Sequence, residues 1–238
     1  MGTLLLVATP IGNLKDFSPR AVESLDSADR IGCEDTRTTG TLLKHFSIEK
    51  PLFSLHQHNE HQKISLVLQW LNSGETIAVV TDAGMPGISD PGFLITRAVY
   101  QENQVYETHD VPVHKIVVIP GPDACSTALV ASGLPSDRYV FEGFLPHKKG
   151  RKTRLDEIKQ RSMTTVLYES PHRVKKLMSE LHEMGEENRM ICVSREMTKL
   201  FEEHLRGTVR QVKQKLDSKE TIKGEIAVVI APKDYKES

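Results

Sequence analysis

The stretch Thr81-Asp-Ala-Gly-Met-Pro-Gly-Ile-Ser-Asp-Pro-Gly92 decides how the chain around it can fold. The apolar run at 76–80 predicts a buried strand, and residues 93–99 predict a helix. Three glycines and two prolines in twelve residues cannot lie inside either element, because glycine adopts unusual backbone angles and proline fixes its own. A plain connection is the alternative, but such connections are usually shorter. We therefore predict a binding loop at the carboxyl end of a strand, where open α/β sheets bind ligands.

The composition is that of a soluble globular protein with a substantial core. Of 238 residues, 38% are hydrophobic and 26% are charged, and the net charge of −1 creates no global field that would attract nucleic acid. The three cysteines are far apart and form no metal-binding spacing, which indicates a reducing compartment. No apolar run reaches membrane-spanning length, so we expect a cytoplasmic protein without a membrane partner.

Short apolar runs alternate with helical patterns along the whole chain. The runs that predict strands lie at 3–8, 30–33, 51–55, 76–80, 115–119, 138–142, 164–168, 190–194 and 225–230. We predict a loop at 101–114, and we expect 204–209 to pair antiparallel with 225–230. Pro120-Gly-Pro122 predicts a hinge. The expected fold class is α/β, with two α/β domains, 1–119 and 120–238, and a ligand cleft between them.

Polar side chains follow several of these strands. Thr9-Pro-Ile-Gly-Asn-Leu14 has no dinucleotide-binding glycine pattern and no P-loop lysine, so it is either a plain turn or the wall of a binding site. Glu34-Asp-Thr-Arg37 is either an ordinary helix start or a functional group of side chains. The three histidines in 56–61 lack a completing ligand pattern, so we predict a polar helix start there and no metal site.

Two features of the second half are candidates for binding. The segment His147-Lys-Lys-Gly-Arg-Lys-Thr-Arg154 has five Lys or Arg in eight residues, which is either a solvated charged face or a docking site for a polyanion. The small residues at 123–131 predict a helix that packs tightly or lets a ligand approach closely. The pairs Ser18-Pro19 and Ser170-Pro171 each predict a helix start.

Six strings of residues occur in the order of one protein family. They are Val7-Ala-Thr-Pro-Ile-Gly-Asn-Leu14, Glu34-Asp-Thr-Arg37, Asp82-Ala-Gly-Met-Pro-Gly-Ile-Ser-Asp-Pro-Gly92, Pro120-Gly-Pro122, Glu142-Gly-Phe-Leu-Pro146 and Tyr168-Glu-Ser-Pro-His-Arg173. From about Thr3 to Ile230 the chain resembles the ribosomal RNA small subunit methyltransferase I family, in the tetrapyrrole methylase superfamily. The resemblance implies S-adenosylmethionine as cofactor and 2′-O-methylation of a cytidine ribose in the decoding region of small-subunit (16S) ribosomal RNA. It also implies a homodimer whose partner is this RNA or the ribosomal subunit.

The resemblance also implies which residues hold the cofactor. Carried over one position at a time, they are Ile11, Gly12, Ala83, Gly84, Met85, Ser89, Asp123, Ala124, Ser126, Tyr168 and Met197. At Met85 and Glu169 the chain differs from the tetrapyrrole-methylating members, which favours the RNA-modifying branch.

A ribose hydroxyl is a weak nucleophile, so we expect a carboxylate to accept its proton. The candidates are Glu34, Asp35 and Glu169, each at a strand end within a motif string. The candidates for binding RNA phosphates are Arg37, Lys148, Lys149, Arg151, Lys152, Arg154 and Arg173. Two alternatives stay open: a small-molecule methyltransferase acting on a tetrapyrrole, and a non-catalytic RNA-binding protein of ribosome assembly.

Overall fold

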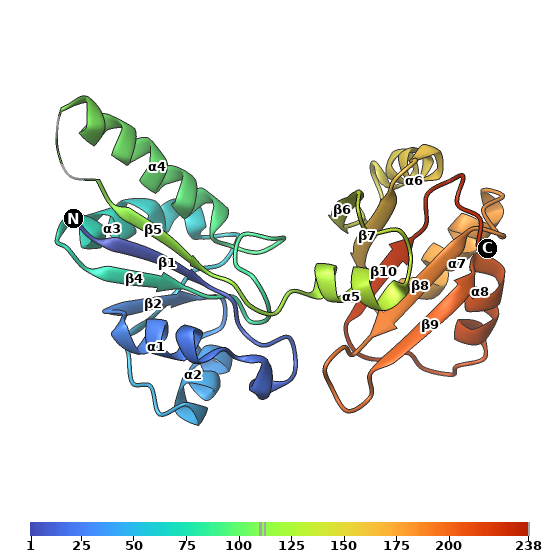
Figure 1. The fold of residues 1–238 in the computed structure, drawn as a ribbon, viewed down its shortest axis with the longest axis horizontal. Helices are drawn as coiled ribbons and strands as arrows, with labels where there is room; N and C mark the ends of the chain where they lie inside the picture. The colour runs from blue at the N-terminus through green and yellow to red at the C-terminus, as the bar shows by residue number, and fades with distance from the viewer. Residues whose placement is uncertain (110, 112, 238) are drawn as a thin grey trace. The chain divides into compact units, whose positions relative to one another are not determined.

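The computed structural model describes residues 1–109, 111 and 113–237 (Figure 1). The chain forms two compact units, Met1–Asp123 and Ala124–Ser238, called unit 1 and unit 2 below. Each unit is a five-stranded sheet with helices on its faces, which confirms the predicted α/β fold class. The division falls after Asp123, whereas the sequence placed it after residue 119.

Unit 1 contains an entirely parallel sheet of order β3-β2-β4-β1-β5. Its strands are β1 (Thr3–Val7), β2 (Arg30–Cys33), β3 (Leu52–Ser54), β4 (Thr76–Val79) and β5 (Lys115–Ile119). Its helices are η1 (Leu14–Asp16, a 3₁₀ turn), α1 (Pro19–Ser27), α2 (Thr36–His45), α3 (Glu60–Asn72) and α4 (Phe93–Thr108). The strands lie within a residue or two of the predicted apolar runs.

The side chains of β1 alternate between the two faces of this sheet. Leu5 and Val7 join the cluster that α1 and α2 cover, while Leu4 and Leu6 join the cluster that α3 and α4 cover. Figure 1 shows the two helix pairs on opposite faces. The neighbouring strands β1 and β4 therefore send the chain to opposite faces, since α1 follows β1 and α4 follows β4. A parallel sheet binds ligands at such a switch point.

Local signals explain most helix ends in unit 1, and one prediction is wrong. The Ser18 hydroxyl accepts the Ala21 N–H at 3.1 Å, as expected of an N-cap. Residues 101–108 continue α4, however, and are not a loop. Buried Val99 and Asn103 hold this polar helix end, and the Asn103 amide bonds both the N–H and the carbonyl of His114, at 2.8 and 2.9 Å. Positions 110 and 112 of the predicted loop lie outside the described residues.

Unit 2 contains a mixed sheet of order β6-β7-β10-β8-β9. Its strands are β6 (Tyr139–Phe144), β7 (Thr164–Glu169), β8 (Met190–Arg195), β9 (Glu203–Thr208) and β10 (Ile226–Ile230). Its helices are α5 (Ala124–Ser132), α6 (Arg151–Gln160), α7 (Val174–Glu183) and α8 (Val209–Asp217). β6 and β7 are parallel, and the other neighbours are antiparallel.

The closing strand β10 forms the centre of unit 2. Its residues Ile226, Val228 and Ile230 face the core under α6, α7 and α8, and its alternate residues face α5. Two predictions are corrected here. β9 pairs with β8 rather than with β10, because β10 already has β7 and β8 on its two sides. The helix after Ser170-Pro171 begins only at Val174, since the Ser170 carbonyl accepts the N–H groups of Arg173 and Val174 in a preceding turn.

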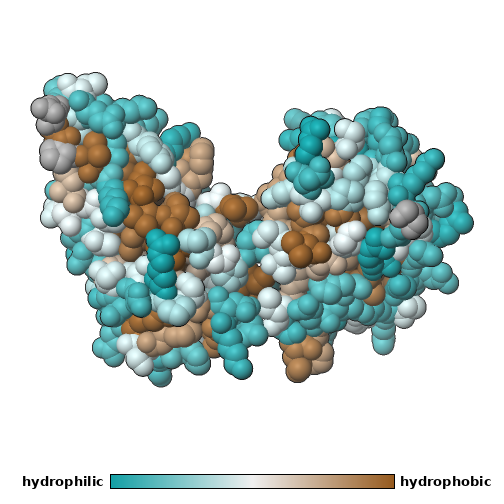
Figure 2. Space-filling view, viewed as in Figure 1, coloured by the Kyte–Doolittle hydropathy of each residue, from teal (hydrophilic) through white to brown (hydrophobic). Residues whose placement is uncertain are grey.

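The surface of unit 1 carries an apolar area at the edge of its sheet. On the face drawn in Figure 2, hydrophobic side chains gather along β5 and the neighbouring side of α4. Val118 on β5 is 49% exposed, and β5 has no second strand neighbour in the described part of the chain. No helix of the described residues is long and apolar enough to cross a membrane.

Candidate functional site

The ends of β1 and β4 are tied together at the switch point of unit 1. The Thr9 N–H donates to the Gly84 carbonyl at 2.9 Å, and the Gly84 N–H donates back to the Thr9 carbonyl at 3.1 Å. The buried hydroxyls of Thr9 and Thr81 add two hydrogen bonds to this connection. Thr9 Oγ1 donates to the Thr81 carbonyl, and Thr81 Oγ1 donates to the Gly84 carbonyl. The loop after β4 and the turn after β1 therefore form one structure.

Glycine is required where the loop after β4 approaches that turn. Gly84 has φ +90°, and a Cβ there would lie 3.4 Å from Ile11 Cγ2. Gly92 has φ +126°, and a Cβ there would lie 3.2 Å from the backbone nitrogen of Gly87. Ser89 has a φ of 64° although it is not glycine, a rare conformation that is found more often at functional sites.

Polar side chains from the start of α3 and from the turn before it hold the far end of this loop in place. Glu60 is 4% exposed and accepts the N–H groups of Gly92 and Ile95, at 2.9 and 3.1 Å. The carboxylate thereby stabilises the first turn of α4. Gln57 Nε2 donates to the Ser89 carbonyl at 2.6 Å. The histidine-rich segment 56–61, which was considered as a metal site, therefore stabilises the Gly/Pro loop through Gln57 and Glu60.

The structure brings the predicted cofactor residues of unit 1 to this edge of the sheet. Ile11 packs beside Gly84, and Ala83, Met85 and Ser89 lie in the loop that is tied to the β1 turn. Gly12 is exposed in that turn, and Asp123 is the last residue of unit 1. These residues offer small side chains and backbone to a ligand.

The remaining predicted cofactor residues lie in unit 2, where most share one apolar cluster. Ala124, Tyr168 and Met197 all pack in the cluster under α5, although they come from a helix start and from the ends of two strands. The Tyr168 ring lies 4.9 Å from the ring of Phe141 and 5.6 Å from that of Phe144. Ser126 is exposed on α5.

A group of carboxylates lies where β2 and β4 end. The Asp82 N–H donates to Glu34 Oε1 at 3.3 Å, and the Asp35 N–H donates to Asp82 Oδ1 at 3.2 Å. Burial raises the pKa of both Glu34 and Asp82. Burial, reinforced by the charges of Glu34 and Asp82, raises the pKa of Asp90 to about 7. Shifted carboxylates of this kind are typical of sites that transfer protons.

Asp35 differs from its neighbours, although it belongs to the same motif. Its side chain caps α2 by accepting the Arg37 N–H at 2.8 Å, and it pairs with the Arg37 guanidinium at 2.7 Å. These bonds to Arg37 lower the pKa of Asp35 to about 2. So acidic a carboxyl is a weak base, which argues against the predicted catalytic role of Asp35. Arg37 itself is exposed over 90% of its side chain and is accessible to a large ligand.

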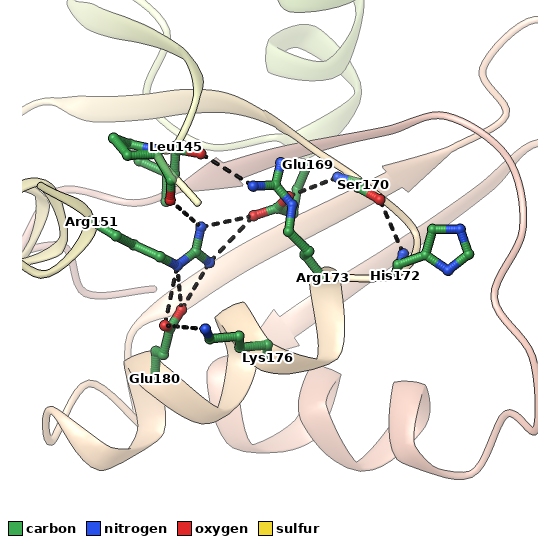
Figure 3. Close-up of polar contacts among 9 residues, drawn as sticks. Leu145, Arg151, Glu169, Ser170, His172, Arg173, Lys176 and Glu180 are labelled. Carbon is green, nitrogen blue, oxygen red and sulfur yellow. Dashed lines mark hydrogen bonds and ion pairs between the residues drawn. The ribbon is translucent and has the colours of Figure 1, made fainter. Parts of the chain in front are cut away.

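The predicted catalytic residue Glu169 lies in an internal ion-pair network of unit 2 (Figure 3). Its side chain is fully buried, 3.3 Å from Arg151 and 2.8 Å from Arg173, and it also accepts the Ser170 N–H. Arg151 is 5% exposed at its side chain and donates further bonds to Glu180. A carboxylate held by two guanidiniums is poorly placed to take a proton, and Arg151 cannot reach RNA phosphates because its guanidinium is buried against Glu169 and Glu180. The structure therefore argues against both predicted roles.

The other predicted RNA-binding residues are exposed, with the exception of Arg173. Lys148 and Lys149 lie in the turn before α6, and Lys152 is on the surface of that helix. Arg154 is 52% exposed and pairs with Glu157 at 2.8 Å. Arg173 is mostly buried, and its Nη1 donates to the Leu145 carbonyl at 3.3 Å.

Asp90 and His56 are not among the residues that the sequence predicted to form the site. Asp90 is in the Gly/Pro loop, but its raised pKa depends on burial and on the charges of Glu34, which is distant in sequence, and of Asp82. His56 follows β3 at the same edge of the sheet, close enough to Glu34 that a positive charge on its ring lowers the pKa of that carboxyl. Its buried Nδ1 has no hydrogen-bond partner among the described residues. No group of three or more Asp, Glu, His or Cys side chains in the described ranges could hold a metal ion.

Comparisons with known proteins agree with this fold. Residues 3–213 match the model of the tetrapyrrole (corrin/porphyrin) methylases. Diphthine synthase superposes with a TM-score of 0.67 at 14% identity, over 97% of this chain and 90% of that one. A uroporphyrin-III C-methyltransferase from Thermus thermophilus superposes with a TM-score of 0.58 at 17% identity, over 97% of this chain and 94% of that one. At such identities the likeness shows the fold alone.

Curated relatives of higher identity carry one name. Proteins named ribosomal RNA small subunit methyltransferase I are 44% identical in Synechocystis, over 97% of this chain and 79% of the relative. The relative in Haemophilus influenzae is 41% identical over 98% of this chain and 79% of its own length. The relative in Bacillus subtilis is 41% identical over 100% of this chain and 77% of its own length.

Proposed function

This chain belongs to the tetrapyrrole (corrin/porphyrin) methylase family, and we propose that it transfers a methyl group from S-adenosylmethionine to small-subunit ribosomal RNA. The observation that carries the proposal is identity above 40% over nearly the whole chain with relatives of that name. We propose further that the methyl acceptor is the 2′-oxygen of a cytidine ribose in the decoding region of this RNA. This finer proposal rests on the six motif strings and on the carboxylates that follow β2 and β4.

The residues at the switch point fit the proposed cofactor. Tight backbone contact at Gly84, the small side chain of Ala83 and the exposed Gly12 would let an extended ligand lie against the two tied loops. Ile11 and Met85 would supply apolar contacts for its methionine and ribose portions. When bound, S-adenosylmethionine supplies an electrophilic methyl group on a sulfonium. The protein residues must then orient the acceptor hydroxyl and exclude water.

We assign the acceptance of the hydroxyl proton to Glu34, with Asp90 as the second candidate. Glu34 follows β2 beside the Asp82 backbone, and burial raises its pKa, which makes the carboxylate a stronger base. Burial also raises the pKa of Asp90, to about 7. Both lie in unit 1 with the loops proposed to hold the donor, and neither carboxylate is neutralised by a guanidinium in the manner of Asp35 and Glu169.

We assign phosphate contacts to Arg37, Lys148, Lys149, Lys152, Arg154 and Arg173. All but Arg173 are well exposed, and four of them come from the basic segment around the start of α6. A cytoplasmic homodimer is also part of the proposal, since the apolar outer edge of β5 is suited to being covered by a second copy.

The experiment that tests this function uses small ribosomal subunits from bacterial cells that lack the protein. Labelled methyl transfer from S-adenosylmethionine is measured, and the labelled nucleotide is digested out and identified. We expect one 2′-O-methylcytidine. Cofactor binding without label in RNA would favour a small-molecule acceptor such as a tetrapyrrole. Absence of cofactor binding would favour a non-catalytic RNA-binding protein.

A further inference from the structure

A pocket of about 680 Å³ lies within unit 2, where the parallel neighbours β6 and β7 end. Phe144, Pro146 and His147 line it from the β6 side, and Ser170, His172 and Arg173 line it from the β7 side. Its volume is in the range of pockets that hold small ligands. None of the cofactor positions carried over from the family lines this pocket.

An exposed aromatic ring forms one wall of this pocket. Phe144 is 57% exposed at the end of β6. Its position is fixed from behind, because its ring lies 5.6 Å from that of Tyr168 at an interplanar angle of 62°. A ring that is held in place and still exposed offers a flat surface on which another flat group can stack.

The charge around the pocket is positive. Figure 3 shows Arg173 over the buried carboxylate of Glu169, which it shares with Arg151. Arg151, Arg173 and Lys176 face only the two carboxylates of Glu169 and Glu180 in this network, so one positive charge is left over. Exposed Lys148 and Lys149 directly follow the lining residue His147. An anionic ligand is therefore favoured here.

We propose that this pocket binds one unpaired nucleotide of single-stranded RNA, with its base stacked on Phe144 and its phosphate toward Arg173 and Lys148. The inference rests on the proposed function for its choice of ligand. A fixed aromatic ring beside a positively charged groove is how proteins hold single-stranded RNA, whereas the bases of a duplex are already stacked on each other. The network of Arg151, Glu169 and Glu180 would keep Arg173 in place.

Binding of a fluorescein-labelled ten-nucleotide oligocytidylate to the full chain tests this inference by anisotropy. We expect Phe144→Ala to weaken binding about 5- to 150-fold, the loss that corresponds to about 1–3 kcal/mol for one stacked base. Phe144→Trp should retain binding. Phe201→Ala is the matched control, because Phe201 is a 67% exposed aromatic of the same unit that does not line the pocket. Equal affinities of Phe144→Ala and Phe201→Ala would overturn the inference.

Two further readouts separate the pocket from the proposed function. In methyl transfer to small subunits, Phe144→Ala should raise the KM for RNA without changing the affinity for S-adenosylmethionine. If the wild-type protein methylates RNA and Phe144→Ala does so with the same KM, the pocket inference fails and the function stands. If oligocytidylate binding depends on Phe144 but no RNA is methylated, the function fails and the pocket stands. Displacement of the oligonucleotide by S-adenosylmethionine would assign the pocket to the donor and overturn the inference.

Discussion

Glu34 in unit 1 and Glu169 in unit 2 stand at similar places, one directly after β2 and the other at the end of β7. The Glu169 side chain is fully buried and lies within ion-pair distance of two guanidiniums. Glu34 is half-buried among other carboxylates, and burial raises its pKa. The same sequence signal thus produces a structural ion pair in one unit and, in the other, a carboxylate with a raised pKa that we propose as the base. The partners that the fold supplies decide which of the two a strand-end carboxylate becomes.

The sheets of the two units also differ in how much of their strand-end polar surface is available to a ligand. The parallel sheet of unit 1 has a switch point between β1 and β4, where glycine-rich loops and polar side chains meet. The sheet of unit 2 is mostly antiparallel, and its strand-end charges are largely used among themselves. We therefore propose that proton transfer takes place in unit 1 and part of the RNA binding in unit 2.

The largest effect is expected from removing the proposed base. Glu34→Gln should slow methyl transfer by about 10²- to 10⁴-fold, the contribution typical of a general base, while leaving S-adenosylmethionine affinity unchanged. Because a base must be deprotonated and burial raises the pKa of Glu34, the rise of the wild-type rate with pH should lie above the pH at which an ordinary glutamate ionises. Glu49→Gln, at an exposed position of the same unit, is the control. Full activity of Glu34→Gln at every pH would exclude this role.

Glu169→Gln should affect stability instead. It leaves Arg151 and Arg173 without their shared carboxylate, and breaking a buried ion pair costs about 3–5 kcal/mol. Urea unfolding measures the loss, with Glu34→Gln as the comparison, which should cost little because burial already disfavours its charged form. If both variants unfold at the same urea concentration, the contrast between the two glutamates is wrong.

Gly84→Ala tests the tie between the two loops of unit 1. An alanine at φ +90° is strained, so we expect a loss of about 1–3 kcal/mol and weaker donor binding. Gly40→Ala is the matched control, because Gly40 lies inside α2 with its nearest neighbour 3.9 Å away and should gain about 0.5–1 kcal/mol. Thermal unfolding and titration with S-adenosylmethionine are measured on both variants. Equal melting temperatures and equal donor affinities of Gly84→Ala and Gly40→Ala would contradict the role of Gly84 in tying the loops.

The smallest effect is expected at Asp90. Its pKa is about 7 in the folded chain and about 3.9 in an unfolded one. Between these values the unfolded state loses its proton first, so this group lowers stability as pH rises from about 4 to 7. Asp90→Asn removes the effect. Asp90 is partly exposed, so solvent screening reduces the contribution of its pKa shift to about 1 kcal/mol, which in a chain of this size should raise the melting temperature at pH 8 by about 2–4 °C. A gain that is equal at pH 4 and pH 8 would contradict the assignment.

Much of the fold could be predicted because its signals are local. The apolar runs predicted the strands, and Ser18 before Pro19 predicted the start of α1. The failures share a physical cause, since they depend on contacts between residues distant in sequence. The end of α4 is held by bonds between Asn103 and His114, and β9 loses β10 as a partner because β7 and β8 occupy both sides of β10.

The candidate site divides in the same way. The Gly/Pro loop and the residues after β1 could be placed at one edge of the sheet from their positions after strands. The burial of Arg151 within a run of exposed lysines could not be predicted, because its partners Glu169 and Glu180 come from β7 and α7. The raised pKa of Asp90 likewise depends on Glu34, which is more than fifty residues away.

Hydrogen–deuterium exchange on the full chain, with and without S-adenosylmethionine, tests the central claim most directly. We expect the donor to slow amide exchange in segments 9–14 and 81–92 of unit 1. Subsequent addition of the oligocytidylate should slow exchange at 144–149 and 170–173 in unit 2. Saturating donor that leaves exchange at 81–92 unchanged would contradict the assignment of the loop after β4 to the methyl donor.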